Sequence, residues 1–288
     1  MTLHDGSLAQ PASMALDAEP STGTRVVAAL RDILAMIRRN LIHIAREPEQ
    51  LGDVTIQPVL FTLLFVYVFG SAVGGTGGSY VQYVVPGLLL MNLTTSSMGT
   101  AVGLTSDLAT GLIDRLRTLP MWTWAILTGR SITDLLTATI CAIIVTLTGL
   151  IVGWQAPSDL AGLLAGFGIA LLFAFALSWL GVCVGLMARS AESAQAFGFM
   201  VLFPLTFVSN ALVPTVGMPE LLRTFADWNP VSAVTAAVRT LWGDPNASLG
   251  SQSWSMQHPV VMALAWSIGL MVVCMPLAAR LFRRRTTD

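Results

Sequence analysis

The chain has 288 residues and a net charge of −1, and 54% of its residues are hydrophobic while only 11% are charged. Soluble domains usually carry about 25% charged residues, so the composition excludes two ordinary soluble domains and indicates one polytopic membrane domain. All fifteen basic residues are arginine, which excludes Schiff-base lysine chemistry and a standard phosphate-binding loop, because that loop needs a lysine.

The N-terminal part combines a polar tail with an amphipathic helix. Residues 1–24 are rich in Ala, Ser, Pro and Thr and lack the basic start and apolar core of a signal peptide, so they predict a disordered cytoplasmic tail. Residues 25–47 place apolar side chains on one helical face and most arginines off it. This pattern predicts a basic helix on the membrane surface. A soluble helix packed on a partner is the alternative.

Six apolar stretches follow, each close to the 20 or so residues that cross a bilayer. Their predicted bounds are 54–73, 82–105, 130–153, 160–187, 194–213 and 259–281. With the N-terminus inside, thirteen of the fifteen arginines are cytoplasmic, and only Arg223 and Arg239 lie outside. The positive-inside rule supports this orientation. The predicted fold class is therefore an all-α polytopic membrane protein with both termini cytoplasmic.

A short charged segment, residues 106–120, lies between the second and third spans. Its four charged residues would each cost about 2.5 to 3.5 kcal/mol at a bilayer centre, far more than its Leu and Ile residues return. The segment must therefore lie in water or against a soluble protein. The segment predicts a short helix, which Ser106 or Asp107 would cap at its N-terminus and Pro120 would end. A solvated loop without a partner is the alternative.

Three further patterns concern packing and charge. Residues 214–258 are too polar to cross and too apolar for a free loop, so they predict two short helices broken at Asn229 and Pro230. Arg130 and Asp134, at the cytoplasmic start of the third span, predict an i,i+4 ion pair, with a direct gating role as the second interpretation. The fourth span has two motifs for close helix packing, at Gly162 with Gly166 and at Gly181 with Gly185.

The three cysteines and three histidines are scattered along the chain. The cysteines form no CxxC pair, and the histidines are too far apart in sequence for a metal cluster. We therefore expect buried structural thiols, no metal site and no catalytic residue.

Two stretches carry a family resemblance. The first is Asp107-Leu-Ala-Thr-Gly-Leu-Ile-Asp-Arg-Leu-Arg-Thr-Leu-Pro-Met121, followed by Gly129-Arg130 and Asp134. The second is Phe207-Val-Ser-Asn-Ala-Leu-Val-Pro214, followed by Met218-Pro219, Asn229-Pro230 and Ala237-Val-Arg-Thr-Leu241. Together they resemble the signature of DrrB-like permeases, which are daunorubicin-resistance-type subunits of type-2 ABC exporters. The resemblance covers the chain from about residue 25 to its end and is not specific for a substrate.

The resemblance implies that residues 25–288 form one type-2 ABC transporter transmembrane domain. Residues 25–47 would be its interfacial connecting helix, and residues 106–120 its coupling helix, which docks on a separate ATPase subunit. Residues 214–258 would be a half-embedded outer hairpin that closes the exit side; a lid packed only for stability is the alternative. ATP and Mg would be bound by the partner, with no cofactor in this chain. The implied coupling residues are Asp107, Gly111, Asp114, Arg115, Arg117 and Pro120.

In this family the substrate path lies at a dimer interface bordered by the first, second and fifth spans. The implied path residues are Phe61, Phe65, Phe69, Asn92, Met98, Phe199, Phe203, Phe207 and Asn210. The two amides are favoured, because a polar amide at membrane depth usually faces protein or a cavity. Six spans make half a transporter, so we expect a homodimer, or a heterodimer with a second permease, in a bacterial plasma membrane and without a nucleic-acid partner.

The predicted function is ATP-driven export of a hydrophobic or amphipathic compound, such as a drug, an antibiotic or a lipid. Export of a lipid-linked polysaccharide or glycolipid is the alternative, since only the cargo differs. A stand-alone secondary transporter would show internal repeats and intramembrane charges. An intramembrane serine protease would need a histidine base at membrane depth, and His258 is the only histidine near a predicted span.

Overall fold

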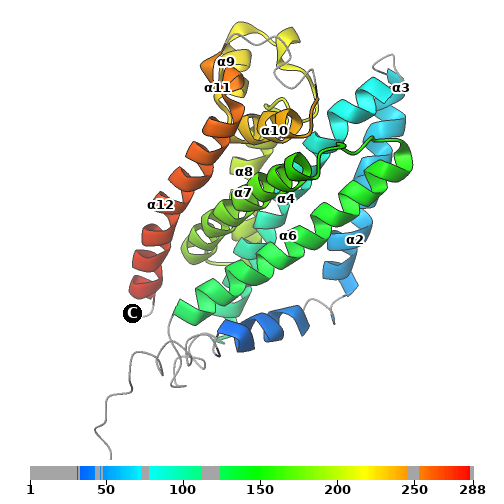
Figure 1. The fold of residues 1–288 in the computed structure, drawn as a ribbon. Helices are drawn as coiled ribbons and strands as arrows, with labels where there is room; N and C mark the ends of the chain where they lie inside the picture. Colours follow the sequence, from blue (N-terminus) through cyan, green and yellow to red (C-terminus); the bar gives the residue numbers. More distant parts are fainter. Residues whose placement is uncertain are drawn as a thin grey trace, which may run out of the picture.

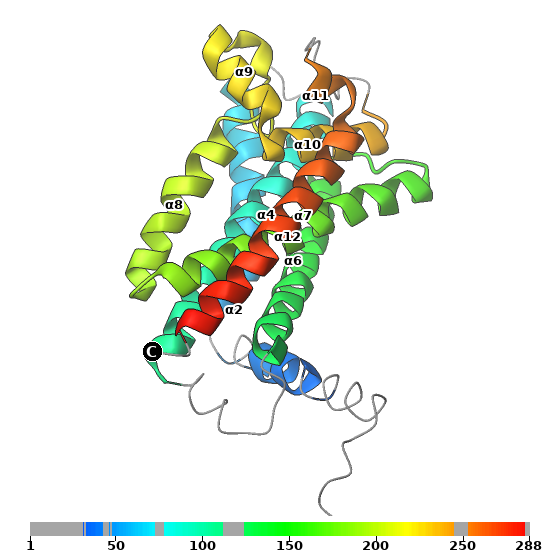
Figure 2. The same cartoon turned by 90° about the vertical axis from the view of Figure 1, so that its left-hand side faces the viewer.

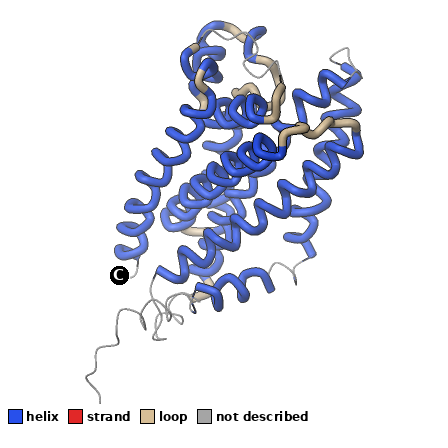
Figure 3. The backbone as a smooth tube through the Cα atoms, in the orientation of Figure 1, coloured by secondary structure: helices blue, strands red, loops and turns tan. Residues whose placement is uncertain are grey.

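The protein is described by a computed structural model that covers residues 31, 33–42, 46, 48–72, 78–111, 124–244 and 253–285. This part of the chain is helical with short loops and contains no β-strand (Figure 3), which confirms the all-α class. Four helical segments are long and apolar enough to cross a membrane, namely Gly52–Phe69, Leu127–Val152, Leu160–Met187 and Pro259–Arg284.

The helices form one bundle with two distinct ends. The elements are α2 (Pro48–Leu63), the π-helix η1 (Leu64–Phe69), α3 (Gly70–Ala72), α4 (Gly78–Ala109), α6 (Trp124–Val152), α7 (Leu160–Met187), α8 (Ala191–Phe207), the 3-10 turn η2 (Thr215–Gly217), α9 (Glu220–Trp228), α10 (Pro230–Leu241), α11 (Trp254–Gln257) and α12 (Pro259–Arg285). Residues 33–42 form a separate helix, here called the surface helix. Figure 1 shows it at the same end of the bundle as the C-terminus, the surface-helix end, whereas α9, α10 and α11 lie at the opposite, hairpin end.

The two other predicted spans correspond to α4 and α8, which are not among the four clear candidates. α4 has 32 residues, but a run of Thr and Ser side chains and one Asn lowers its mean hydropathy. α8 has 17 residues and ends at Phe207 rather than at the predicted residue 213. It ends early because side chains from the hairpin end bind its last carbonyl groups, as described below.

α4 and α7 lie at the centre of the bundle, in contact with each other and with α6, α8, α10 and α12. The predicted close packing of α7 is confirmed on both of its glycine motifs. A Cβ on Gly185 would lie 2.7 Å from the Ala101 carbonyl oxygen of α4, and a Cβ on Gly166 would collide with the Trp242 indole. The three cysteines are buried and free, as predicted.

The two short helices predicted on either side of Asn229 and Pro230 are present, whereas the predicted start of a helix in the charged segment is not. α9 and α10 are two short helices separated at Asn229, with Pro230 in the first turn of α10. By contrast, the predicted helix start at Ser106 or Asp107 is wrong, because α4 continues through both residues to Ala109. α4 then ends in a turn at Gly111, whose φ of 64° is in the left-handed region that favours glycine.

Candidate functional site

Asp107, in the last turn of α4, joins three helices at the surface-helix end of the bundle. Its Oδ1 accepts a charged hydrogen bond from Arg39 Nη2 of the surface helix at 3.2 Å, and its Oδ2 accepts one from Arg130 Nη1 of α6 at 3.1 Å. Both carboxylate oxygens are therefore engaged within the chain. The Asp107 side chain keeps only 24% of its surface exposed.

Arg130 lies along α4 rather than in solvent. Its Nη2 donates to the Gly99 carbonyl at 3.2 Å, and its Nη1 reaches Asp107 two turns further along the same helix. Between these contacts the guanidinium lies over Gly103, where a Cβ would collide with it. Because Gly99, Gly103 and Asp107 are four residues apart, they share one face of α4, and the two glycines leave that face open for the arginine.

Asp134, one turn after Arg130, also contacts α4. Its Oδ2 accepts a hydrogen bond from the Thr100 hydroxyl at 2.7 Å. The predicted i,i+4 ion pair between Arg130 and Asp134 is therefore not the contact that the structure shows, since each residue binds its own partner on α4. Arg130 and Asp134 are spaced for an i,i+4 contact within α6. They bind α4 instead, because α4 places polar partners within hydrogen-bond distance of each.

The surface helix is fixed to the same junction. Met36 is buried, and its Cβ would lie 2.7 Å from a Cβ placed on Gly129 of α6, which fixes the close approach of the two helices. Asn40 Nδ2 donates to the Thr133 hydroxyl at 3.5 Å. We call the contacts of Arg39, Asp107 and Arg130 the arginine clamp. Among the described residues, the clamp connects the surface helix, the end of α4 and the start of α6.

The predicted coupling residues are only partly visible. Asp107 lies in the arginine clamp, and Gly111 forms the turn at which α4 ends. Asp114, Arg115, Arg117 and Pro120 lie outside the described residues, as does the rest of the segment 112–123. The described residues that flank this segment are Gly111, four residues after Asp107, and Trp124, six residues before Arg130.

The predicted path phenylalanines form two stacked groups on different helices. Phe65 and Phe69 of η1 stack with ring centres 4.8 Å apart, and Phe203 and Phe207 of α8 stack at 4.3 Å. Both groups flank α4, because η1 and α8 each pack against it. Phe69, Phe203 and Phe207 are about half exposed, whereas Phe65 is packed against the core. Of the two other predicted aromatics, Phe61 stacks on Phe65 and Phe199 is exposed.

The other predicted path residues are engaged inside the chain. Asn92 is buried and donates to the Leu88 carbonyl of its own helix at 2.8 Å. Asn210 is 2% exposed, and its Nδ2 contacts Met256 Sδ at 3.5 Å. Met98 of α4 is half-buried and packs against α8, since a Cβ on Gly198 would lie 3.1 Å from its Cε. A substrate path along these residues stays a prediction.

The hairpin end holds a residue that the sequence analysis did not select. Arg239 of α10 is fully buried, at 0% exposure. Its guanidinium donates to the carbonyls of Tyr83 at 2.8 Å, Asn210 at 3.0 Å and Ala211 at 2.9 Å. It also lies 3.7 Å from the centre of the Tyr83 ring, a distance at which cation–π attraction is expected. Burial lowers the pKa of Arg239, and nearby Tyr83 and Asp244 oppose that shift.

Two further side chains bind the end of α8 and the turn that follows it. Asn229 Nδ2 donates to the Leu205 and Val208 carbonyls, each at 2.7 Å, and the Ser232 hydroxyl accepts from the Asn210 N–H at 2.9 Å. The last carbonyls of a helix have no partner within the helix, so these contacts explain why α8 can end inside the protein. The second sequence motif contains both Asn229 and Arg239. The sequence did not reveal that they bind these backbone groups, because the groups are more than 20 residues away in the chain.

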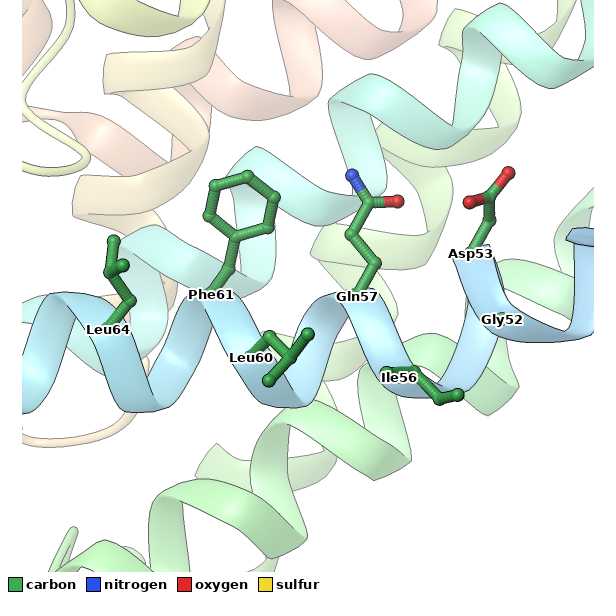
Figure 4. A pocket seen from close by; sticks show the side chains of 7 residues that line it. All are labelled: Gly52, Asp53, Ile56, Gln57, Leu60, Phe61 and Leu64. Atoms are coloured by element: carbon green, nitrogen blue, oxygen red, sulfur yellow. The ribbon is translucent and has the colours of Figure 1, made fainter.

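Two cavities border the described helices. One, of about 460 Å³, opens along the outside of a single helix, and Figure 4 shows its lining residues, which are Gly52, Asp53, Ile56, Gln57, Leu60, Phe61 and Leu64. The other, of about 520 Å³, lies at the hairpin end beside Trp154 and Trp242. Among the described residues, no three His, Cys, Asp or Glu side chains form a group that could hold a metal ion.

Comparison with known proteins identifies the family. The model of the ABC-2 type transporter family matches residues 31–241. The chain is 30% identical to the "Daunorubicin resistance ABC transporter permease protein DrrB1" of Streptomyces coeruleorubidus, over 92% of this chain and 89% of that protein. It is 25% identical to the "Probable doxorubicin resistance ABC transporter permease protein DrrC" of Mycobacterium tuberculosis, over 88% of this chain and 89% of that protein. The chain belongs to the ABC-2 type transporter family.

Proposed function

We propose that this chain is the permease subunit of an ATP-driven exporter that moves a hydrophobic or amphipathic compound out of the cell. The observation that carries the proposal is the arginine clamp at the two ends of segment 112–123. That segment is charged and joins the two clamped helices in the chain, and such a segment is suited to bind a soluble protein. In this family the natural partner is a separate ATPase subunit, which would bind ATP and Mg. The drug names of two relatives support a drug or similar amphipathic compound as cargo.

We also propose that α4 and α8 cross the membrane together with the four apolar segments. Six spans would bring the N- and C-termini to the same side, and the arginine distribution makes that side the cytoplasm of a bacterium. The surface helix would then lie at the cytoplasmic surface, and α9 to α11 would form the outer hairpin. The surface helix and the end of α12 lie together in Figure 1, which supports this arrangement.

A second permease copy, identical or related, would complete the transporter. α8 lies along one edge of the bundle (Figure 2), and six of its apolar side chains are at least 47% exposed, namely Phe197, Phe199, Met200, Val201, Phe203 and Phe207. So large an apolar face suits another helix or lipid. The stacked phenylalanines of η1 and α8 would then border the substrate path at the interface between the two copies.

The first test is purification of the affinity-tagged chain from its native host. We expect an ATPase subunit to co-purify and ATP to drive daunorubicin or doxorubicin transport in membrane vesicles. If no ATPase is recovered, the proposal is wrong. If an ATPase is recovered but only a lipid-linked glycan is transported, the exporter assignment holds and the drug cargo does not.

Asp114→Arg tests the docking segment, because it reverses a charge on the acidic side of the predicted coupling helix. We expect ATP-dependent transport to fall roughly tenfold, within the usual range of coupling between two sites, while the protein still inserts and folds. Glu220→Arg makes the same charge change on exposed α9 at the opposite end and should leave transport unchanged. Normal transport by Asp114→Arg would contradict docking at this segment.

A further inference from the structure

The arginine clamp joins the two long helices that flank segment 112–123 in the chain. α4 leads into segment 112–123 and α6 leads out of it. Asp107 is in the last turn of α4, and Arg130 is in the second turn of α6. A force applied to the segment therefore reaches two long helices through two separate backbone connections. α4 and α6 already pack against each other, and a polar tie at these ends would keep the segment from separating them there.

We propose that Arg130 is a positioning residue that makes α4 and α6 respond to the ATPase as one body. This inference rests on the proposed function, since it assumes that an ATPase acts on segment 112–123. Arg130 grips α4 at the Gly99 carbonyl and at Asp107 and lies over Gly103 between them. Asp134 adds a hydrogen bond to Thr100 on the same pair of helices.

The clamp also changes the role of Asp107. The resemblance makes Asp107 a residue of the docking segment, whereas the structure shows its Oδ1 bound by Arg39 and its Oδ2 by Arg130. Asp107 therefore holds the end of α4 against two helices of its own chain. Because Arg39 belongs to the surface helix, that helix moves with the same body.

Two neighbouring glycines provide a matched pair of variants. In Gly103→Ala, the new methyl group would collide with the Arg130 guanidinium and displace it from α4, with every charge retained. In Gly99→Ala, the new methyl group meets nothing within 4 Å, and the carbonyl that binds Arg130 remains. Both changes replace glycine by alanine in the same helix, so their effects on helix propensity are equal.

The first experiment tests the clamp in the permease alone. Thermal unfolding in lipid nanodiscs is measured for Asp107→Asn, Arg130→Gln and the double variant. We expect each single change to lower the midpoint by about 2–4 °C, and the double variant to lower it by less than the sum of the two single shifts, because both changes remove the same Arg130–Asp107 contact. Gly103→Ala should lower the midpoint relative to Gly99→Ala. Additive shifts, together with equal midpoints for the two glycine variants, would overturn the clamp.

The second experiment tests transmission in the complex with the co-purified ATPase. Spin labels at exposed Ala109 of α4 and exposed Leu136 of α6 report the distance between the two helices. In the parent and in Gly99→Ala, ATP with vanadate should leave this distance unchanged, because the helices move together. In Gly103→Ala and Asp107→Asn the distance should change or its distribution should broaden.

The outcomes separate the inference from the function on which it rests. If the two clamp variants give the same nucleotide response as Gly99→Ala, the positioning role is wrong although the ATPase still binds. If no ATPase co-purifies, both the proposed function and the role of Arg130 in transmission are wrong. The unfolding data still decide whether the clamp exists. A purely structural role for Arg130 would lower the unfolding midpoint without altering the nucleotide response.

Discussion

Each end of the helix bundle is held by an arginine, and the two arginines bind different groups. Arg130, at the surface-helix end, pairs with a carboxylate and keeps 18% of its side chain exposed. Arg239, at the hairpin end, is fully buried and donates to the carbonyls of three residues. A partly hydrated ion pair contributes little to the free energy of unfolding. A buried arginine that satisfies otherwise unpaired carbonyls is costly to remove. We therefore expect small losses of stability from variants at the first end and large losses at the second.

The largest effect should come from Arg239→Met, which leaves the carbonyls of Tyr83, Asn210 and Ala211 without this donor. We expect a loss of about 3 kcal/mol or more in unfolding free energy, seen as a midpoint lowered by about 6–12 °C in nanodiscs. Arg239→Lys keeps the charge but not the planar guanidinium group. Its unfolding midpoint should lie between those of the parent and Arg239→Met. A loss below about 1 kcal/mol for Arg239→Met would show that the hairpin end does not depend on this residue.

A smaller effect at the same end should follow from Gly87→Ala. The new methyl group would collide with the Ala211 carbonyl oxygen, a backbone atom that cannot rotate away, so we expect a loss of about 1–3 kcal/mol. Gly168→Ala on α7 is the control, because its methyl group meets nothing within 4 Å and should stabilise the helix by about 0.5–1 kcal/mol. Equal unfolding midpoints for these two variants would contradict the tight contact between α4 and the end of α8.

The smallest effect should come from Arg39→Met at the surface-helix end. The Arg39 side chain is 33% exposed, so its ion pair with Asp107 should contribute at most about 1 kcal/mol. The loss should shrink in about 1 M salt, where the screening length is only about 3 Å. Unfolding curves at low and high salt provide the measurement. A loss that is large and independent of salt would remove the contrast between the two ends.

Much of the fold could be predicted because hydropathy and helix breakers act locally. The predicted fourth span, residues 160–187, has the same bounds as α7, and the break at Asn229 and Pro230 is present. The prediction for Ser106 and Asp107 was wrong for a tertiary reason. Both residues are good N-caps in isolation, but Arg39 and Arg130 hold Asp107 in the last turn of α4.

The candidate site was predictable only in part. The spacing of Arg130 and Asp134 predicted a local ion pair, whereas both residues bind α4. Asn210 was selected as a polar side chain within a span, yet the hairpin end binds its carbonyl and N–H as well as that side chain. Arg239 entered the sequence prediction only through its side of the membrane, and its complete burial is a finding of the structure.

By itself, the sequence determined the helical class, the charged segment that lipid rejects and the absence of a lysine for a phosphate-binding loop. These properties follow from the transfer free energies and chemistry of individual residues, which need no knowledge of neighbours. The tertiary structure alone decided that Arg130 fills a glycine-lined face of α4 and that Arg239 binds the carbonyls of Tyr83, Asn210 and Ala211. Those roles depend on groups up to 156 residues apart in the chain, which only folding brings within hydrogen-bond distance.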